Sequence, residues 1–314
     1  MSYSTKTAKK VLPTHSDPKV LANEFNTFFI NKIKLIRESI PEINDVPAYY
    51  SRPFDGDKLT NFQPTTEEEI KKIIAKHGIK TCEEDPIPSK LFKAALDIIL
   101  PTLVKLINLS LAEGSIDGVN WSVLDPLLKK FGLDCDVWKN YRPVNNLLFF
   151  SKITERVVSN RTEDHMDKHN LHESSQYAYK SRHNTEIMML GVTDEVLRGF
   201  DENMATVVIF LDLSAAFDTI DTNKMLQILE QELGISGNAL KWFESFLTSR
   251  TQWVKISGVS TLKASRYRLV RPKDLSLDPS CLTPTFDHSH LSSRRICSAH
   301  HDSLMTRTDI VNLH

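Results

Sequence analysis

Apolar residues recur at helical spacing through much of the chain. Between Lys19 and Ile40 they follow near-helical intervals, and Pro41 ends the pattern, which predicts a helix over 19–40. A stretch rich in Pro over 41–64 is typical of a linker. Thr65–Glu69 then offers a capping box and an acidic first turn for the next helix. The same pattern predicts helices over 65–77, 89–99, from Pro101 to about Glu113, 151–170, 184–199, 221–233, and after Ser236.

Shorter apolar runs predict strands over 121–130, from Tyr141 onward, and over Trp253–Ile256. The run 205–213 has β-branched residues at 206–209 and little alternation, so both of its faces are expected to be covered. Together the segments predict a mixed α/β (α+β) fold. Beyond Gly258 the periodicity is lost among Ser, Arg, His, Asp and Pro, so no regular structure is expected over 259–314.

Composition narrows the class of protein. The chain has 314 residues, 40% apolar and 25% charged, which is ordinary for a globular protein. Its net charge of −1 means that any nucleic-acid-binding surface has to be local. No apolar run reaches the roughly 18 residues of a membrane span. The N-terminus lacks an apolar signal core, and the 4 Cys form no CxxC pair. We therefore expect an intracellular protein, cytoplasmic or nuclear and not secreted, without a membrane partner.

The candidate chemistry is concentrated in 207–218. An apolar run ends on Asp212 and is followed by small residues, Phe217 and Asp218. A buried strand that ends on a carboxylate is a common way to hold a hard divalent cation, because such cations prefer oxygen ligands. The structural alternative is a strand end followed by a helix N-cap, a role that Asp often fills. The motif alone leaves both interpretations open.

This segment resembles the reverse transcriptases of non-LTR (LINE-type), Jockey-like retrotransposons, and other blocks resemble the same family in the family's order. The blocks are Phe25–Ile33 with Ile36 and Arg37, Asp85–Leu91, Pro126–Lys130, Asn140–Val144, Gln176–Lys180, His183–Glu186, and Gly234–Gly237 through Arg250–Gln252. The resemblance implies the fingers and a partial palm of a right-hand polymerase, with an incomplete palm sheet. The expected segments are a disordered N-terminus over 1–17, a helix and linker over 18–64, a fingers-like region over 65–204, the first part of the palm over 205–258, and an out-of-frame tail over 259–314.

The resemblance also implies roles for single residues. Asp212 would be the first metal-binding carboxylate of the palm, helped by the backbone of Leu213. Phe217 would pack under the incoming sugar, and Arg142 and Lys180 would contact the triphosphate. The family more often has Arg at the position of Lys180, and Lys lacks its bidentate geometry. Intact members use Mg²⁺, an RNA template, a DNA primer and deoxynucleoside triphosphates.

The chain lacks other parts that the family's chemistry needs. Two metal ions about 3.5–4 Å apart align the attacking oxygen and the leaving pyrophosphate. In the family, the remaining carboxylates are an adjacent Asp pair on a neighbouring hairpin. This sequence contains no Asp-Asp dipeptide and no Gly-x-Pro-Gln-Gly segment. The resemblance therefore predicts a truncated, catalytically inactive member, in which the strand at 205–213 keeps an unpaired apolar edge.

A shift of reading frame explains both absences. With permitted codons and an offset of two nucleotides, Leu269–Cys281 encodes Gly-Ser-Pro-Gln-Gly, and Asp302–Arg307 encodes Phe-Ala-Asp-Asp. The hypothesis places the shift between about 258 and 269. Zinc binding by the Cys and His of the tail is an alternative, but their spacing matches no common finger. Two further alternatives are a non-catalytic RNA- or DNA-binding remnant and a repurposed helical interaction protein.

Overall fold

The computed structural model describes residues 12–15, 17–40, 53–79, 81–116, 118, 121–172, 177, 183–212, 219–248, 250–256, 259–260, 265–266, 293–300 and 304–313. For 209–212 and for everything beyond 256, only the backbone is described. The helices are α1 (Pro18–Ser39), α2 (Glu67–His77), α3 (Ser89–Ala94), α4 (Leu96–Glu113), α5 (Phe149–Lys168), α6 (Thr185–Asp201), α7 (Thr222–Gln231) and α8 (Gly237–Thr248). The strands are β1 (Trp121–Leu128), β2 (Tyr141–Leu147), β3 (Ala205–Asp212), β4 (Thr251–Ile256), β5 (Val259–Ser260), β6 (Ser265–Arg266), β7 (Ser293–His300) and β8 (Leu304–Leu313).

The main core lies among the helices. Trp242, Phe243 and Phe246 of α8 are fully buried and pack against apolar residues of α2, α4, α5 and α7. Trp242 also donates a hydrogen bond from Nε1 to the Ser110 hydroxyl at 3.1 Å, which satisfies its one polar atom. The predicted helices that supply this core are confirmed, because their apolar stripes face one another.

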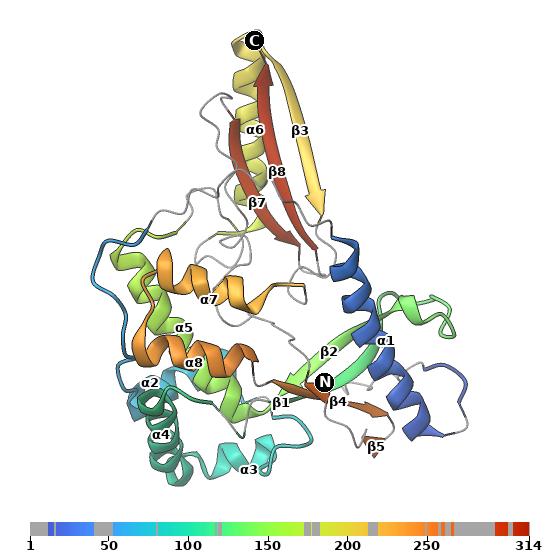
Figure 1. Ribbon diagram of the computed structural model, residues 1–314, viewed down its shortest axis with the longest axis vertical. Helices are drawn as coiled ribbons and strands as arrows, with labels where there is room; N and C mark the ends of the chain where they lie inside the picture. Colours follow the sequence, from blue (N-terminus) through green and yellow to red (C-terminus); the bar gives the residue numbers. More distant parts are fainter. Residues whose placement is uncertain are drawn as a thin grey trace, which may run out of the picture.

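A second core joins α1 to a mixed sheet. Strand β1 pairs antiparallel with β2 and parallel with β4, and α1 lies over this sheet (Figure 1). Phe25 of α1 stacks edge-on against Tyr141 and Trp138, with ring centroids 4.9 and 4.5 Å away. The helix predicted over 19–40 is thereby packed against the strands predicted around 121–130 and 141.

A third unit stands apart from the rest of the molecule in Figure 1 and consists of α6 with a sheet in the order β3-β8-β7. Strand β3 pairs antiparallel with β8 along its length, from Ala205 opposite Leu313 to Asp212 opposite Thr306. The expectation of no regular structure over 259–314 is therefore wrong for β7 and β8. The physical reason is that the backbone groups of an apolar strand need partners.

Two other expectations for β3 are also corrected. The edge expected to stay unpaired is covered by β8, and only its other edge is without a strand in the part of the chain that the structure describes. Its faces are not both covered, because Ala205 and Val207 are exposed. Helix α6 covers one face, where Val208 packs against Met188 and Val192.

The helix expected to begin at Pro101 begins earlier. Helix α4 starts at Leu96 and runs through Pro101. A proline inside a helix removes the hydrogen bond to the carbonyl four residues before it. The residue that loses this bond is Asp97, which is exposed, so water can hydrate its carbonyl.

Candidate functional site

Strand β3 places Asp212 at its C-terminal end, as the sequence motif predicts. The backbone of Asp212 lies opposite Thr306 of β8, and Leu211 lies opposite Arg307. Residues 213–218, which include the predicted site residues Leu213 and Phe217, lie outside the described residues, and so does Lys180. The structure therefore places the strand end that carries the motif, and the roles of these side chains stay predictions.

The chain directly after the 213–218 segment is anchored by two sets of hydrogen bonds. After it, the Asp221 carboxylate accepts hydrogen bonds from the backbone N–H groups of Asn223 and Lys224 at 2.8 and 3.0 Å, which caps α7. Arg37, in the last turn of α1, donates a hydrogen bond from Nη2 to the carbonyl of Ile220 at 2.8 Å. The helix that precedes the polymerase-like region thus holds the chain directly after the motif. Arg37 lies in one of the blocks that resemble the family, but its contact with Ile220, 183 residues away, leaves no signal in the sequence.

Of the two predicted triphosphate ligands, only Arg142 lies among the described residues. It lies on β2 opposite Leu127 of β1. It is half-buried. Its neighbour Tyr141 is fully buried and donates its hydroxyl to the carbonyl of Cys135 at 2.9 Å. Burial raises the pKa of Tyr141 to about 12, so this phenol stays neutral and structural.

The Asp85–Leu91 block proves to be a structural joint. One carboxylate oxygen of Asp85 accepts from the backbone N–H of Phe149 at 2.8 Å, at the start of α5, and the other accepts from Cys82 N–H at 2.7 Å. Lys255 of β4 binds the carboxylate of Glu83 at 2.8 Å and also that of Glu84, and these hydrogen bonds raise its pKa. Asp85 thus joins the block to α5, and the two glutamates directly before the block join this part of the chain to β4.

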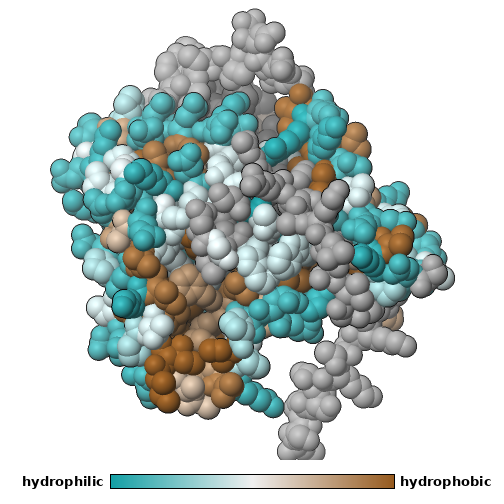
Figure 2. Space-filling model, turned by 60° about the horizontal axis from the view of Figure 1, so that its bottom comes forward, coloured by the Kyte–Doolittle hydropathy of each residue, from teal (hydrophilic) through white to brown (hydrophobic). Residues whose placement is uncertain are grey.

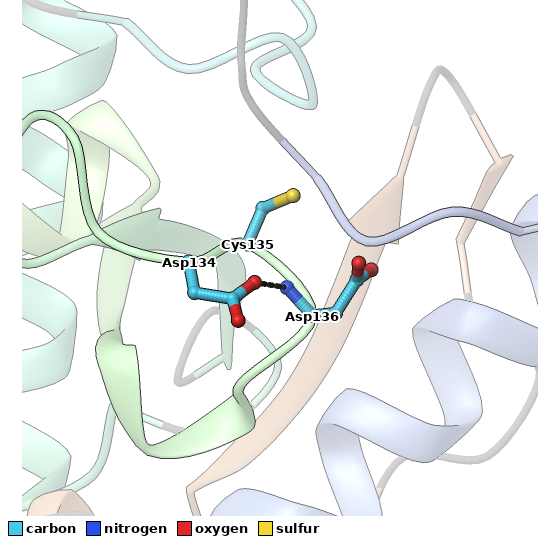
Figure 3. A group of neighbouring side chains, drawn as sticks. All are labelled: Asp134, Cys135 and Asp136. Atoms are coloured by element: carbon cyan, nitrogen blue, oxygen red, sulfur yellow. Dashed lines mark hydrogen bonds between the residues drawn. The ribbon is translucent and has the colours of Figure 1, made fainter.

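One group of potential metal ligands lies close together among the described residues, in the loop between β1 and β2 (Figure 3). It consists of Asp134, Cys135 and Asp136. The Asp134 carboxylate accepts from the backbone N–H of Asp136 at 2.9 Å, and Asp136 accepts from Thr14 N–H at 3.2 Å. Both carboxylates are exposed and accept backbone N–H groups. The stabilisation of a turn therefore accounts for this cluster.

An open hollow of about 720 Å³ lies between α1 and the loop before β2. Phe28 and Trp138 line it, with ring centroids 5.9 Å apart. Elsewhere on α1, Lys32 lies near Lys129, and burial together with the Lys32 ammonium lowers the pKa of Lys129. The hollow is also lined by Glu24 and by neutral polar side chains.

Comparison with known proteins identifies the class. Residues 128–268 match the family model "Reverse transcriptase (RNA-dependent DNA polymerase)". This region runs from the last residue of β1 and contains β2, β3 with the Asp212 motif, and β4. This part of the chain is accordingly similar to the reverse transcriptases of mobile elements.

Two Drosophila melanogaster proteins are among its relatives. The chain is 27% identical over 176 residues to "RNA-directed DNA polymerase from mobile element jockey", which covers 56% of the chain and 19% of that protein. It is 29% identical over 82 residues to "Probable RNA-directed DNA polymerase from transposon BS", which covers 26% of the chain and 9% of that protein. The matched part therefore spans a fifth or less of either relative. None of the described helices is both long and apolar enough to cross a membrane.

Proposed function

We propose that the chain is a fragment of a retrotransposon reverse transcriptase that no longer catalyses DNA synthesis. In the intact family the reaction is RNA-templated addition of deoxynucleotides to a DNA primer, with Mg²⁺ as the metal. The observation that carries the proposal is Asp212 at the end of β3, without an Asp-Asp dipeptide anywhere in the sequence.

The donors beside Asp212 do not fit a two-metal site. The backbone ladder sets Thr306 opposite Asp212 and Arg307 opposite Leu211. The two residues that pair with the end of β3 therefore supply no second carboxylate, although Mg²⁺ binds through carboxylates and substrate phosphates. A single carboxylate does not neutralise the charge that develops in phosphoryl transfer. We therefore assign no metal-dependent step to this chain.

The register of β3 and β8 supports the proposed change of reading frame. In the shifted frame, the codons of 304–306 encode the Asp pair. Residue 306 lies directly opposite Asp212. Restoring the frame would therefore put the Asp pair beside Asp212, where two-metal chemistry requires it.

Primer extension tests the inactivity. The purified chain is given an RNA homopolymer template, a DNA primer, the complementary deoxynucleotide and Mg²⁺ or Mn²⁺. We expect no incorporation above the level of an Asp212→Ala variant. Incorporation by the unaltered chain that the Asp212→Ala variant loses would show that the proposal of inactivity is wrong.

Genomic and transcript sequencing tests the change of frame. We expect codons over 269–282 and 302–307 that encode Gly-Ser-Pro-Gln-Gly and Phe-Ala-Asp-Asp at the offset of two nucleotides. Codons that encode other residues in that frame would eliminate the frameshift hypothesis. The primer-extension result stands independently of this test.

A second candidate function is non-catalytic binding of single-stranded RNA or DNA, favoured by the hollow at Phe28 and Trp138. Half-buried aromatic rings that line a hollow can stack on bases, and the ammonium groups of Lys32 and Lys129 can attract phosphates. We expect a salt-sensitive gel shift of an unstructured RNA that the double variant Lys32→Glu, Lys129→Glu loses. Lys34→Glu is the matched control, because Lys34 lies on the same helix and already pairs with Glu38 at 3.7 Å. A shift of equal strength in the double variant would rule out this surface.

A further inference from the structure

The outer side of α3 and α4 exposes a continuous set of aliphatic side chains. On α4, Ile98 is 82% exposed, Leu109 51% and Leu106 48%, and Leu91 of α3 is 59% exposed. The three α4 positions project from one side of the helix, because they recur close to whole numbers of turns. Figure 2, in which the bottom of the molecule is turned forward, shows apolar residues gathered in one patch there. We refer to Leu91, Ile98, Leu106 and Leu109 as the α4 face.

The α4 face differs from an ordinary surface helix. The opposite side of α4 is already buried in the main core, so this helix is apolar on both sides. A helix that is apolar all round is normally buried on all sides. Isolated exposed apolar residues need no explanation, but a contiguous patch marks an interaction site.

Positive charge borders the α4 face. Lys90, Lys93 and Lys105 are exposed, and none of them forms an ion pair within the part of the chain that the structure describes. The nearby acid Asp97 is already paired with Lys71, at 3.0 Å between Nζ and Oδ1. The surface therefore has an aliphatic centre and a rim of lysines whose charge is not neutralised by described neighbours.

We propose that the α4 face is the docking surface for an acidic amphipathic helix of a partner protein. The partner helix would place aliphatic residues on Ile98 and Leu109 and carboxylates beside the lysines. Aliphatic ridges on two helices interdigitate, and complementary charge at the rim sets partner choice. With 18 residues, α4 offers several turns for such a contact. The contact does not depend on nucleotidyl-transfer chemistry, so either proposal can fail without the other.

The charge pattern distinguishes this partner from other occupants. A second copy of the chain would bring lysines against lysines, which is unfavourable. A helix that lies on a membrane surface has a strongly charged face opposite its apolar face. The opposite side of α4 is instead buried in the main core, so α4 lacks this arrangement.

Two synthetic helical peptides with the same leucine spacing test the proposal, one flanked by Glu and the other by Lys. Fluorescence anisotropy should show that the chain binds the Glu peptide about tenfold more tightly or better than the Lys peptide. Ile98→Glu should weaken binding of the Glu peptide by about tenfold or more, because it puts a like charge in the centre of the contact. Lys105→Glu should weaken binding of the Glu peptide to the chain and strengthen binding of the Lys peptide.

Leu197→Glu is the matched control, because Leu197 is a comparably exposed leucine, 56% exposed, on α6. It should leave binding of the Glu peptide unchanged. Circular dichroism checks that each variant keeps its helices, which is expected because the substituted side chains are exposed. Equal binding of the two peptides, or no effect of Ile98→Glu, would overturn the proposal. Two further outcomes would also overturn the proposal. If the unaltered chain forms a dimer in sedimentation and Ile98→Glu abolishes it, the occupant is a second copy of the chain. If the unaltered chain binds phosphatidylserine vesicles and Ile98→Glu abolishes this binding, the occupant is a membrane.

Discussion

The main helical core and the unit of α6 with β3, β8 and β7 are built in opposite ways. The helical core gathers apolar residues from many elements around the fully buried Trp242. The smaller unit has a cluster of only Met188 and Val192, with Val208 and Tyr177 beside it, among the side chains that the structure describes. Its exposed residues include Val207 at 44% and Phe200 at 66%. Asp212, the residue on which the resemblance to polymerases rests, therefore lies on a unit whose described side chains are more exposed than those of the helical core.

The sequence motif of a site and the packing around that site are separate properties. The Asp212 motif persists because its sequence is intact. A polymerase site also needs rigid elements behind its ligands, and here β3 has one neighbouring strand whose residues carry no Asp pair. The following predictions test this comparison.

The largest difference is expected in hydrogen exchange. Backbone amides of α5 and α8 should exchange at the rate of global unfolding, whereas those of β3 and β8 should exchange by local opening, about tenfold faster or more. The physical reason is that β3 lies at the edge of its sheet among the described strands and that Val207 on it is 44% exposed. Exchange measured by mass spectrometry or NMR checks this, and equal protection in the two units would show that the comparison is wrong.

Trp242→Ala should destabilise the protein by about 3–5 kcal/mol, because it leaves a large cavity in the main core. The free energy of unfolding from urea titration measures the loss. Phe200→Ala is the control in the smaller unit and should cost less than about 1 kcal/mol, because Phe200 is 66% exposed. A cost in Phe200→Ala equal to that in Trp242→Ala would contradict the contrast between the units.

The buried ion pair between α5 and the start of β4 gives the next effect. Arg250 binds Glu155 at 3.0 Å, with side chains 8% and 1% exposed, and its guanidinium lies 4.2 Å from the centroid of the Phe246 ring. Glu155→Gln should cost about 3 kcal/mol, because it leaves a buried cation without its countercharge. Replacing both residues with Met should cost less than the sum of the single changes. Glu38→Gln, in the exposed pair with Lys34, should change the free energy of unfolding by less than about 1 kcal/mol.

The smallest effect concerns pH. His165 is buried against the Leu233 carbonyl, with Nε2 2.7 Å from its oxygen, and burial lowers its pKa. The unfolded chain therefore takes up the proton first. The free energy of unfolding should fall as the pH drops below about 6.5, and this loss should stop once the pH is below the folded pKa. His165→Asn should reduce this dependence, measured by urea titration at several pH values. An unchanged pH dependence would assign the effect to another group.

Much of the helical architecture was predictable from the sequence. The helices over 19–40, 65–77 and 151–170 were found from apolar periodicity, and Thr66 caps α2 as the local motif predicts, by accepting from Glu69 N–H at 3.2 Å. The second half of that capping box differs, since the Glu69 carboxylate binds Arg161 of α5 at 2.6 Å. The local motif therefore predicted where α2 begins. The Glu69 side chain, however, pairs with Arg161, which is distant in the sequence.

The candidate site was predictable only in part. The position of Asp212 at a strand end followed from the apolar run before it. The contact from Arg37 to Ile220 spans 183 residues. The pairing of β3 with β8 also joins distant segments, and no local sequence pattern indicates it. Neither contact leaves a periodic signal, because each depends on which segments meet in space.

The sequence alone was enough to predict the resemblance to reverse transcriptases and the placement of most helices and strands, and it shows that no Asp pair is present. Local periodicity, caps and motif order record these properties along the chain. Only the tertiary structure decided that α1 holds the chain beyond the Asp212 motif, that Thr306 lies opposite Asp212, and that α4 leaves an aliphatic face in solvent. The physical reason is that hydrogen-bond partners, strand pairing and burial are properties of residues that meet in space, and chain distance does not specify them.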